Sequence, residues 1–491
     1  MNISLLYAAE LSATEISKTV LYDLSLDKSF SAICSDSKKR ATFLDILSRP
    51  LHTKAEIGYR QEILRDFTEN PESFEALARG FDRLCGIFAD DEKQRAALFR
   101  ERGIHVNEKS VASARNHLQI ASTTLKRCLL ELSTLDRLFE TFPVKSHGLC
   151  ALRDKLRGTV RTAEFDALLR WTSKFETYSA VVAYDCRLRL GASGKVEVCQ
   201  LIPNTAKMHA TQDPQKKTLR FFQKQRASVH GEEAAVKLNA PPNALTNRLM
   251  ADSILDIAEL FDAALRVFAA DYRKISGELD FYAVALRYCA FLMQKGASLV
   301  YPEFYAEDGM RLTGAYDLFL ATQRSALHAV SANDIESGNK NGILVFGANG
   351  SGKTVFLRTV GTIQVLAQAG LPVLCNTAKL RLYRHIATVF SRSEDKTALD
   401  SNGGRFEQEV GDFKEILDFI GESTLVLLNE TFQTTAYEEG ADALYWILKY
   451  LTYQKADWML VTHIRQLIRL LLADNVLMLT TGENFRILPW N

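Results

Sequence analysis

The strongest constraint on the fold is an eight-residue segment that fits the pattern G-x-x-x-x-G-K-[S/T] in full. It reads Gly347-Ala348-Asn349-Gly350-Ser351-Gly352-Lys353-Thr354. An apolar stretch, 343–346, precedes it, and a stretch of helical character, 354–369, follows. The glycines let backbone N–H groups turn inward around a phosphate, and the helix adds the partial positive charge of its N-terminus. We therefore expect a strand, a phosphate-binding loop and a helix in this order.

The pattern after about residue 310 predicts an α/β domain with a largely parallel central sheet, because short apolar runs alternate with helical stretches. The predicted strands are 343–346, 371–375, 424–428, 458–462, 476–480 and 485–488. The predicted helices between them are 354–369, 406–420 and 441–451. We assign 311–491 to this domain, an α/β P-loop NTPase domain of the ABC type.

The loop and the strand ends that follow it predict an ATP and Mg²⁺ site. Lys353 would contact the β- and γ-phosphates, and the Thr354 hydroxyl would bind Mg²⁺. The strand 424–428 runs into Asn429, where an aspartate is usual, and Glu430. The amide brings no charge, so metal affinity should be weaker and turnover slow. Glu430 would orient or deprotonate the attacking water; the alternative is that the pair only terminates a strand.

Thr462-His463 follows the next predicted strand. A histidine at that strand end would donate a hydrogen bond to the γ-phosphate. A purely structural histidine is the alternative.

Long helices are predicted ahead of the α/β domain. The chain contains ten prolines, and none lies between Pro71 and Pro143 or between Pro242 and Pro302. An interior proline costs a helix about 3 kcal/mol, so these windows permit long helices. From Leu245 onward, apolar residues recur at steps of three to five, which indicates one buried stripe; its simplest interpretation is a helix-bundle core. The stripe comprises Leu249, Ile254, Ile257, Leu260, Phe261, Leu265 and Phe268.

We expect an N-terminal helical segment, 1–35, then core helices over 36–186 and returning core helices over 243–310. The segment between them, 187–242, has a different composition. Basic residues dominate it, short alternating runs such as 195–198 indicate strands, and glycines and prolines indicate turns. Such a small β-rich insertion would contact nucleic-acid phosphates or would be only a solvated loop region. The residues for the contact are Lys216, Lys217, Arg220 and Lys224.

Composition excludes several classes of protein. The formal net charge is +1, so no global field favours binding to nucleic acid or membranes. The eight cysteines are scattered without zinc-site spacing, which indicates reduced thiols and a cytoplasmic protein. The N-terminus lacks the basic and apolar regions of a signal peptide, and no apolar run is long enough to span a membrane.

These motifs together resemble the MutS family of DNA mismatch-repair ATPases. The specific marks are Asn349 inside the loop, Leu357-Arg358 beyond it, the run 366–370, Asn429-Glu430 and Thr462-His463. Upstream, Pro50-Leu51, Ile57 and Arg60-Gln61 are similar to the start of the family's lever helices, and Leu279-Asp280 with Tyr301-Pro302 is similar to the end of its helical core. By position, the insertion 187–242 would be the clamp that contacts the DNA backbone.

The sequence also departs from the family pattern. We expect a short member without the N-terminal mismatch-recognition and connector domains. The segment that acts in trans on the partner subunit's nucleotide, usually Ser-Thr-Phe, reads Gly404-Arg405-Phe406, so Arg405 or Asn402 would substitute for the serine. The position of the aromatic residue that stacks on the base is occupied by Val330.

The resemblance implies an ATP-binding, DNA-associated ATPase that acts as a homodimer, in mismatch repair or in related DNA repair or recombination. Binding of duplex or branched DNA would be directed at the backbone, with weak or no mismatch selectivity. Two alternatives stay open: an interaction protein that binds nucleotide but hardly hydrolyses it, and a ribosome- or RNA-directed relative.

Overall fold

The computed structural model describes residues 3–8, 15–104, 111–178, 184–190, 196–203, 244–305, 309–340, 342–391, 411, 413–431 and 437–490. The chain forms two compact units. Unit 1 contains Glu72–Pro143 and Ala151–Ser276, and unit 2 contains Ile3–Pro71, Val144–Cys150 and Gly277–Asn491. The five-part division expected from the sequence stays a prediction.

Unit 1 is largely helical, as the proline distribution predicts. Its helices are α5 (Pro71–Ile104), α6 (Val111–Thr141), most of α7 (His147–Val160), α8 (Ala163–Tyr178) and the first part of α9 (Ala244–Gln294). Pro71 is the first residue of α5, where its missing N–H costs nothing. Strands β1 (Tyr184–Leu190) and β2 (Val196–Pro203) pair antiparallel. No helix in the described part of the chain has both the length and the apolar character needed to cross a membrane.

Helix α9 buries most of the predicted apolar stripe. Ile254, Phe261, Leu265 and Phe268 are each at least 90% buried, and the ring of Phe261 meets that of Phe175 edge-on. The inclusion of Leu260 in the stripe is wrong, since 69% of this residue is exposed. A helix turns about 100° per residue, so Leu260 projects away from the face that its neighbour Phe261 buries.

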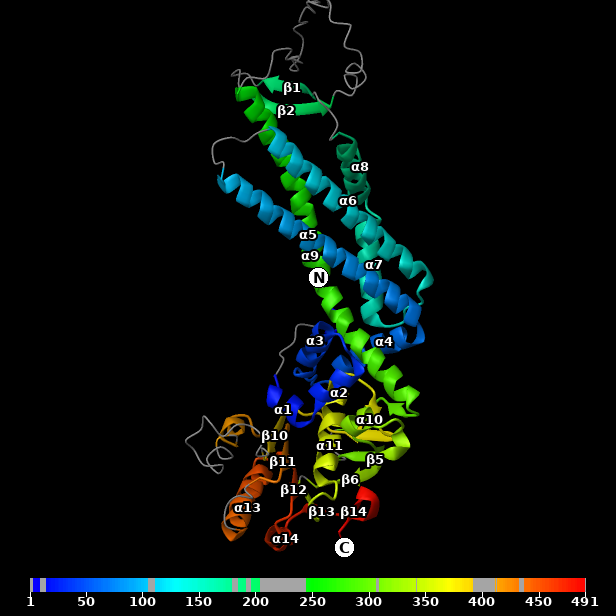
Figure 1. The fold of residues 1–491 in the computed structure, drawn as a ribbon, viewed down its shortest axis with the longest axis vertical. Helices are drawn as coiled ribbons and strands as arrows, with labels where there is room; N and C mark the ends of the chain where they lie inside the picture. The colour runs from blue at the N-terminus through cyan, green and yellow to red at the C-terminus, as the bar shows by residue number, and fades with distance from the viewer. Residues whose placement is uncertain are drawn as a thin grey trace, which may run out of the picture. The chain divides into compact units, whose positions relative to one another are not determined.

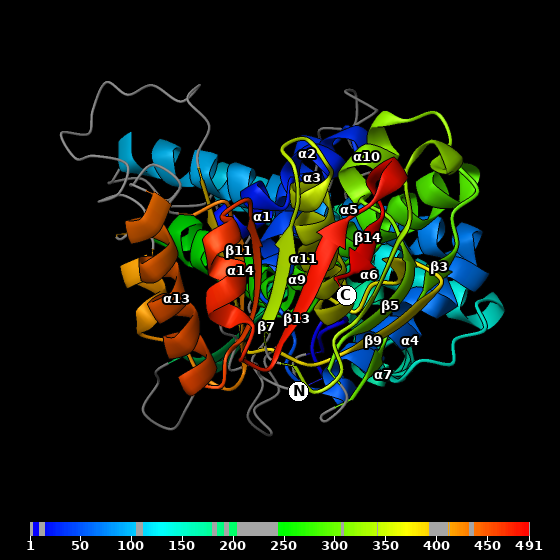
Figure 2. The same ribbon diagram turned by 90° about the horizontal axis from the view of Figure 1, so that it is seen from below.

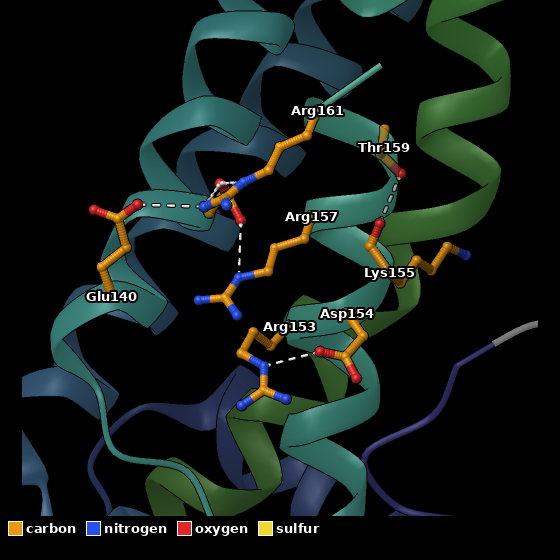
Figure 3. A network of polar contacts seen from close by, with 8 residues as sticks. Glu140, Arg153, Asp154, Lys155, Arg157, Thr159 and Arg161 are labelled. Atoms are coloured by element: carbon orange, nitrogen blue, oxygen red, sulfur yellow. Dashed lines mark hydrogen bonds and ion pairs between the residues drawn. The ribbon is translucent and has the colours of Figure 1, made fainter.

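A polar network joins α6 and α7 inside unit 1 (Figure 3). Arg157 and Arg161 both approach Asp136, at 3.7 and 3.2 Å, and Arg161 also reaches Glu140. Asp136 is only 4% exposed, and a buried carboxylate requires such cationic partners. Arg157 and Arg161 are four residues apart, so both lie on the same side of the chain at the end of α7. The network therefore holds α6 and α7 together.

Unit 2 begins with four helices, which include the helical segment predicted near the N-terminus. These are α1 (Lys18–Asp23), α2 (Leu26–Ile33), α3 (Ser37–Leu47) and α4 (Lys54–Glu69). Helix α4 starts with a capping box in which Thr53 and Glu56 each accept from the other's backbone N–H.

The main sheet of unit 2 has six strands in the order β10-β11-β12-β7-β13-β14 (Figures 1 and 2). The strands are β7 (Gly342–Phe346), β10 (His385–Phe390), β11 (Thr424–Asn429), β12 (Asp457–Thr462), β13 (Val476–Thr481) and β14 (Ile487–Pro489). All neighbours are parallel except β13 and β14. The prediction of helices followed by an α/β region is therefore confirmed.

Helices cover both faces of this sheet. Leu344, Val426 and Leu460 belong to a core cluster that also contains apolar residues of α13 (Tyr437–Tyr453) and α14 (Arg465–Leu471). Side chains alternate between faces along a strand, and Leu427, next to Val426, lies against Gly361 of α11 (Lys353–Gln368). Helix α11 therefore packs on the face opposite α13 and α14.

Two smaller sheets depart from the sequence prediction. The predicted strand 371–375 shrinks to β8 (Val373–Leu374), which pairs with β3 (Leu299–Val300) outside the main sheet. Strands β4 (Glu303–Phe304), β9 (Thr377–Leu380), β5 (Arg311–Ala315) and β6 (Asn333–Glu336) form a separate four-stranded sheet. These strands are two to five residues long and carry no apolar run, so periodicity could not identify them.

Helix α11 is anchored at its C-terminal end by buried polar groups. Arg60 is fully buried and donates to the carbonyls of Ala369 and Leu6. Gln368, also fully buried, donates to Leu51 O and Tyr383 O, and Leu51 N donates back to Gln368 O. A cation at the C-terminus of a helix interacts favourably with its dipole, so these contacts hold the helix in one position.

Unit 2 should become less stable as the pH falls below about 6.5. Burial lowers the pKa of both His52 and His385 from the ordinary 6.5, and the neighbouring charges of His52 and Arg384 lower the pKa of His385 further. The unfolded chain then binds more protons, so the stabilisation is complete above pH 6.5 and is lost as the pH falls through the folded pKa. The loss should stay below about 1.4 kcal/mol per pH unit for each proton.

Urea unfolding at pH 7.5 and 5.5 measures this effect. His52→Gln combined with His385→Gln should flatten the pH dependence, whereas His328→Gln, at an exposed position, should keep it. An unchanged slope in the double variant would assign the pH dependence to other groups.

Candidate phosphate-binding site

The loop between β7 and α11 has the geometry of an anion cradle. Gly350 and Gly352 adopt left-handed conformations, with φ of +75° and +93°, which strongly favour glycine. Gly352 is the N-cap of α11, and no described side chain caps this helix start. Its first N–H groups are therefore available to an anion at the carboxyl edge of the parallel strands.

Lys353 occupies the centre of this loop. Its Nζ donates to the carbonyls of Gly347 and Ala348, at 3.0 and 2.7 Å, and lies 3.9 Å from the Glu430 carboxylate. Only 3% of the residue is exposed. Burial lowers the pKa of Lys353, and the charge of Glu430 acts in the opposite direction. The backbone carbonyls of Gly347 and Ala348 thus hold the ammonium inside the loop.

Thr354 and Asn429 are brought together from the helix and from the end of β11. The Thr354 hydroxyl donates to Asn429 Oδ1 at 2.9 Å. Asn429 is 9% exposed, at the last position of a strand whose residues are all buried. The two side chains offer a pair of neutral oxygen atoms next to the loop, and oxygen is the ligand that Mg²⁺ prefers.

Glu430 has an unusual backbone conformation. Its φ is +53°, although it is not a glycine, and its N–H donates to Val461 O of the neighbouring strand at 2.9 Å. Such strained positions cost about 1–3 kcal/mol and cluster at ligand sites. In this conformation the Glu430 carboxylate lies 3.9 Å from Lys353 Nζ, just beyond the end of β11.

His463 lies beyond β12, as the sequence predicts, and borders a groove that also contains Gly347, Ala348 and Asn349. The Thr462 hydroxyl accepts from Ile464 N at 3.1 Å and shapes the turn after the strand. The structure thus brings the loop, Asn429, Glu430 and His463 to one edge of the sheet.

Phe485 is a candidate site residue that the sequence did not reveal. It is 57% exposed, and its Cβ lies 3.2 Å from where a Cβ on Gly352 would be. The prediction of a strand over 485–488 is wrong at its start, since Phe485 belongs to a short 3₁₀ turn and has φ of +61°. Asn333 donates to Phe485 O and accepts from Ile487 N, which supports this conformation. An exposed aromatic face here can stack on a nucleotide base.

Val330 cannot provide that surface, because it is 7% exposed and is not aromatic. No local pattern marks Phe485, because it reaches the loop only through the folding of the chain. The predicted trans segment (Asn402, Gly404, Arg405) and the predicted DNA contacts (Lys216, Lys217, Arg220, Lys224) lie outside the described residues.

A glycine-rich loop and an uncapped helix start at the carboxyl edge of a parallel sheet characterise α/β domains that bind phosphate groups. Comparisons with known proteins show which family of such domains this one resembles. Residues 343–480 match the family model of MutS domain V. Endonuclease MutS2 of Streptococcus sanguinis is 28% identical over 195 residues, which are 39% of this chain and 23% of that protein.

Two further relatives match over shorter regions. The mitochondrial DNA mismatch repair protein mutS homolog of Sarcophyton glaucum is 32% identical over 31% of this chain and 15% of its own length. Human MutS protein homolog 4 is 28% identical over 29% of this chain and 15% of its own length. The chain thus spans less than a quarter of the length of each of these three relatives. Together with the family-model match to residues 343–480, they support the assignment of this chain to the MutS family.

Gly352→Ala should destabilise the protein more than Gly350→Ala. Both substitutions put a Cβ on a left-handed residue, at a cost of about 1–2 kcal/mol. A Cβ at position 352 would also press on Phe485, whereas position 350 has nothing within 4 Å. Urea unfolding of the two variants measures the difference, and equal losses would mean that Phe485 does not pack on the loop as described.

Proposed function

We propose that this chain is a DNA-associated ATPase that binds ATP at the loop 347–354. The observation that carries the proposal is the position of Lys353, buried inside a loop at an uncapped helix start. Family membership supports it, because relatives are named for DNA mismatch repair and as an endonuclease. Mismatch repair or a related DNA process is the corresponding proposed role.

The residues of the site divide the chemistry between them. The loop N–H groups and Lys353 would bind the β- and γ-phosphates. Glu430 would accept a proton from the attacking water, and His463 would donate a hydrogen bond to the γ-phosphate. Thr354 and Asn429 would hold Mg²⁺ together with phosphate oxygens, and their 2.9 Å contact fits that role. The metal would supply positive charge that offsets the phosphate oxygens.

The partners belong to the proposal as well. DNA would be held through its backbone by the basic insertion 187–242, with little mismatch selectivity. We further propose a homodimer in the cytoplasm, in which the segment around 402–406 closes the partner's nucleotide site.

A nucleotide-binding protein with little hydrolysis is the second candidate, and Asn429 is the observation that favours it. The amide brings no charge to the metal site, so phosphate transfer would be poorly supported. Glu430→Gln separates the two candidates. In an ATPase it should lower the single-turnover rate by about 10²–10⁴-fold, and in a binding protein it should change nothing.

The test of the proposed function is nucleotide binding and hydrolysis, with and without DNA. Lys353→Ala should weaken ATP binding about 10- to 100-fold, since it removes hydrogen bonds to a charged group worth about 1.5–3 kcal/mol. Phe485→Ala should weaken binding of ATP but not of inorganic triphosphate, which has no base. Homoduplex, mispaired, branched and single-stranded DNA at two salt concentrations should change the ATPase rate with little difference between matched and mispaired duplex.

Calorimetry with Mg²⁺ and a single-turnover assay provide the measurements. Wild-type protein that binds no ATP, or a Lys353→Ala variant that binds it equally well, would exclude the proposed site. ATPase activity that responds to RNA and to none of the DNA substrates would point to the RNA-directed alternative.

Asn429→Asp should lower the Mg²⁺ concentration that ATP binding requires. A carboxylate in place of Asn429 Oδ1 adds a negative charge 2.9 Å from the Thr354 hydroxyl, and the gain of about 1 kcal/mol corresponds to about fivefold. The measurement is the Mg²⁺ concentration that gives half-maximal ATP binding. Asn475→Asp, which adds the same charge at the opposite edge of the sheet, should leave this concentration unchanged; an equal shift in both variants would indicate a non-specific charge effect.

A further inference from the structure

A groove of about 880 Å³ opens beside the first half of the phosphate-binding loop. Gly347 to Asn349 form one wall, His463 stands at the end of β12, and Arg465 and Arg469 project from α14. Trp490, whose ring meets Phe346 edge-on at 5.6 Å, lies in the lining as well. The charged side chains of this groove are therefore cationic, and the groove begins at a loop that can hold an anion.

Without the cationic side chains of this groove, the loop has too little positive charge to neutralise a triphosphate. Lys353 is the buried cation of the loop, and the Glu430 carboxylate lies 3.9 Å from it. Asn429, at the metal position, is neutral. Phosphoryl transfer spreads negative charge over the three oxygens of the γ-phosphate, and enzymes neutralise that charge with metal ions and arginine or lysine. The described residues of the loop and of β11 provide little net positive charge for this purpose.

Arg465 can provide this missing positive charge. It is exposed, and no ion pair joins it to any described carboxylate. It is the first residue of α14, two residues after His463, and buried Leu467 and Ile468 fix the orientation of that helix. The turn before it is fixed by the bond between Ile464 N and Thr462 Oγ1. The guanidinium thus belongs to the same wall as His463, on a rigid element.

We propose that Arg465 contacts the γ-phosphate of ATP bound in its own subunit and stabilises the charge of the transferring phosphoryl group. The inference rests on the proposed ATP site and names a further catalytic residue in it. A planar guanidinium with several N–H groups suits two phosphate oxygens at once. The positive charge of Arg465, from the same subunit, would compensate for the lack of a charge on Asn429.

The reaction that Arg465 would assist is hydrolysis. A water oxygen forms a bond to the γ-phosphorus, and its proton passes to the Glu430 carboxylate. The bond from the γ-phosphorus to the β,γ-bridging oxygen breaks, its electron pair stays on ADP, and inorganic phosphate leaves. Arg465 loses its partner with the γ-phosphate, so it should favour ATP over ADP.

The test compares Arg465→Ala, Arg465→Lys and Arg469→Ala with the wild type. Arg465→Ala should reduce the single-turnover rate about 10²–10³-fold, the range for loss of one charge-stabilising donor. It should also weaken binding of the non-hydrolysable analogue adenylyl-imidodiphosphate about tenfold, with ADP affinity unchanged. Arg465→Lys should recover part of the analogue affinity but little of the rate, because an ammonium lacks the two-pronged geometry. Unchanged ADP affinity also shows that the variants fold.

Arg324→Ala, at an exposed position outside the groove, is the matched control and should behave like the wild type. Arg465→Ala indistinguishable from this control would overturn the assignment, and so would a loss confined to Arg469→Ala. In either case wild-type ATP binding that Lys353→Ala weakens would leave the proposed function intact. A wild-type protein that binds no nucleotide would overturn both.

Discussion

The fixed position of helix α11 is the constraint on which the rest of unit 2 depends. At its start, two left-handed glycines direct the loop back over Lys353. At its end, the buried guanidinium of Arg60 and the amide of Gln368 bind carbonyls from the N-terminal segment and from the loop before β10. The helix that begins at the loop is therefore joined at its other end to Leu6 and Leu51, which lie far away in the sequence.

Electrostatics at the site follow from this arrangement. Lys353 loses hydration, which lowers its pKa, and the carbonyls of the loop and Glu430 compensate for that loss. The positive charge of Lys353 is therefore opposed by the Glu430 carboxylate 3.9 Å away, and Asn429 adds no charge. A highly charged ligand then depends on groups outside the loop, which is the physical reason for the role we assign to Arg465.

Part of this structure could be predicted from the sequence, because it is encoded in local patterns. The apolar runs of β7, β11, β12 and β13, and the glycine–lysine loop between β7 and α11, all occur where predicted. Local pattern was insufficient elsewhere. Strand β10 mixes buried residues with half-buried ones such as His385 and Thr388, so it contains no continuous apolar run, and the four-stranded sheet is built from strands of two to five residues. Such strands are stabilised by their partners, which are distant in sequence.

The sequence by itself determined the class of domain and the residues proposed to bind phosphate, because a loop of this kind needs glycine, lysine and threonine at fixed spacing. Only the tertiary structure decided what surrounds them. Phe485 lies against Gly352, and Arg465 borders the groove that starts at Gly347, through contacts that span more than a hundred residues. Spacing along a chain specifies a loop, whereas neighbours across a sheet are set by strand order and packing, which no single segment encodes.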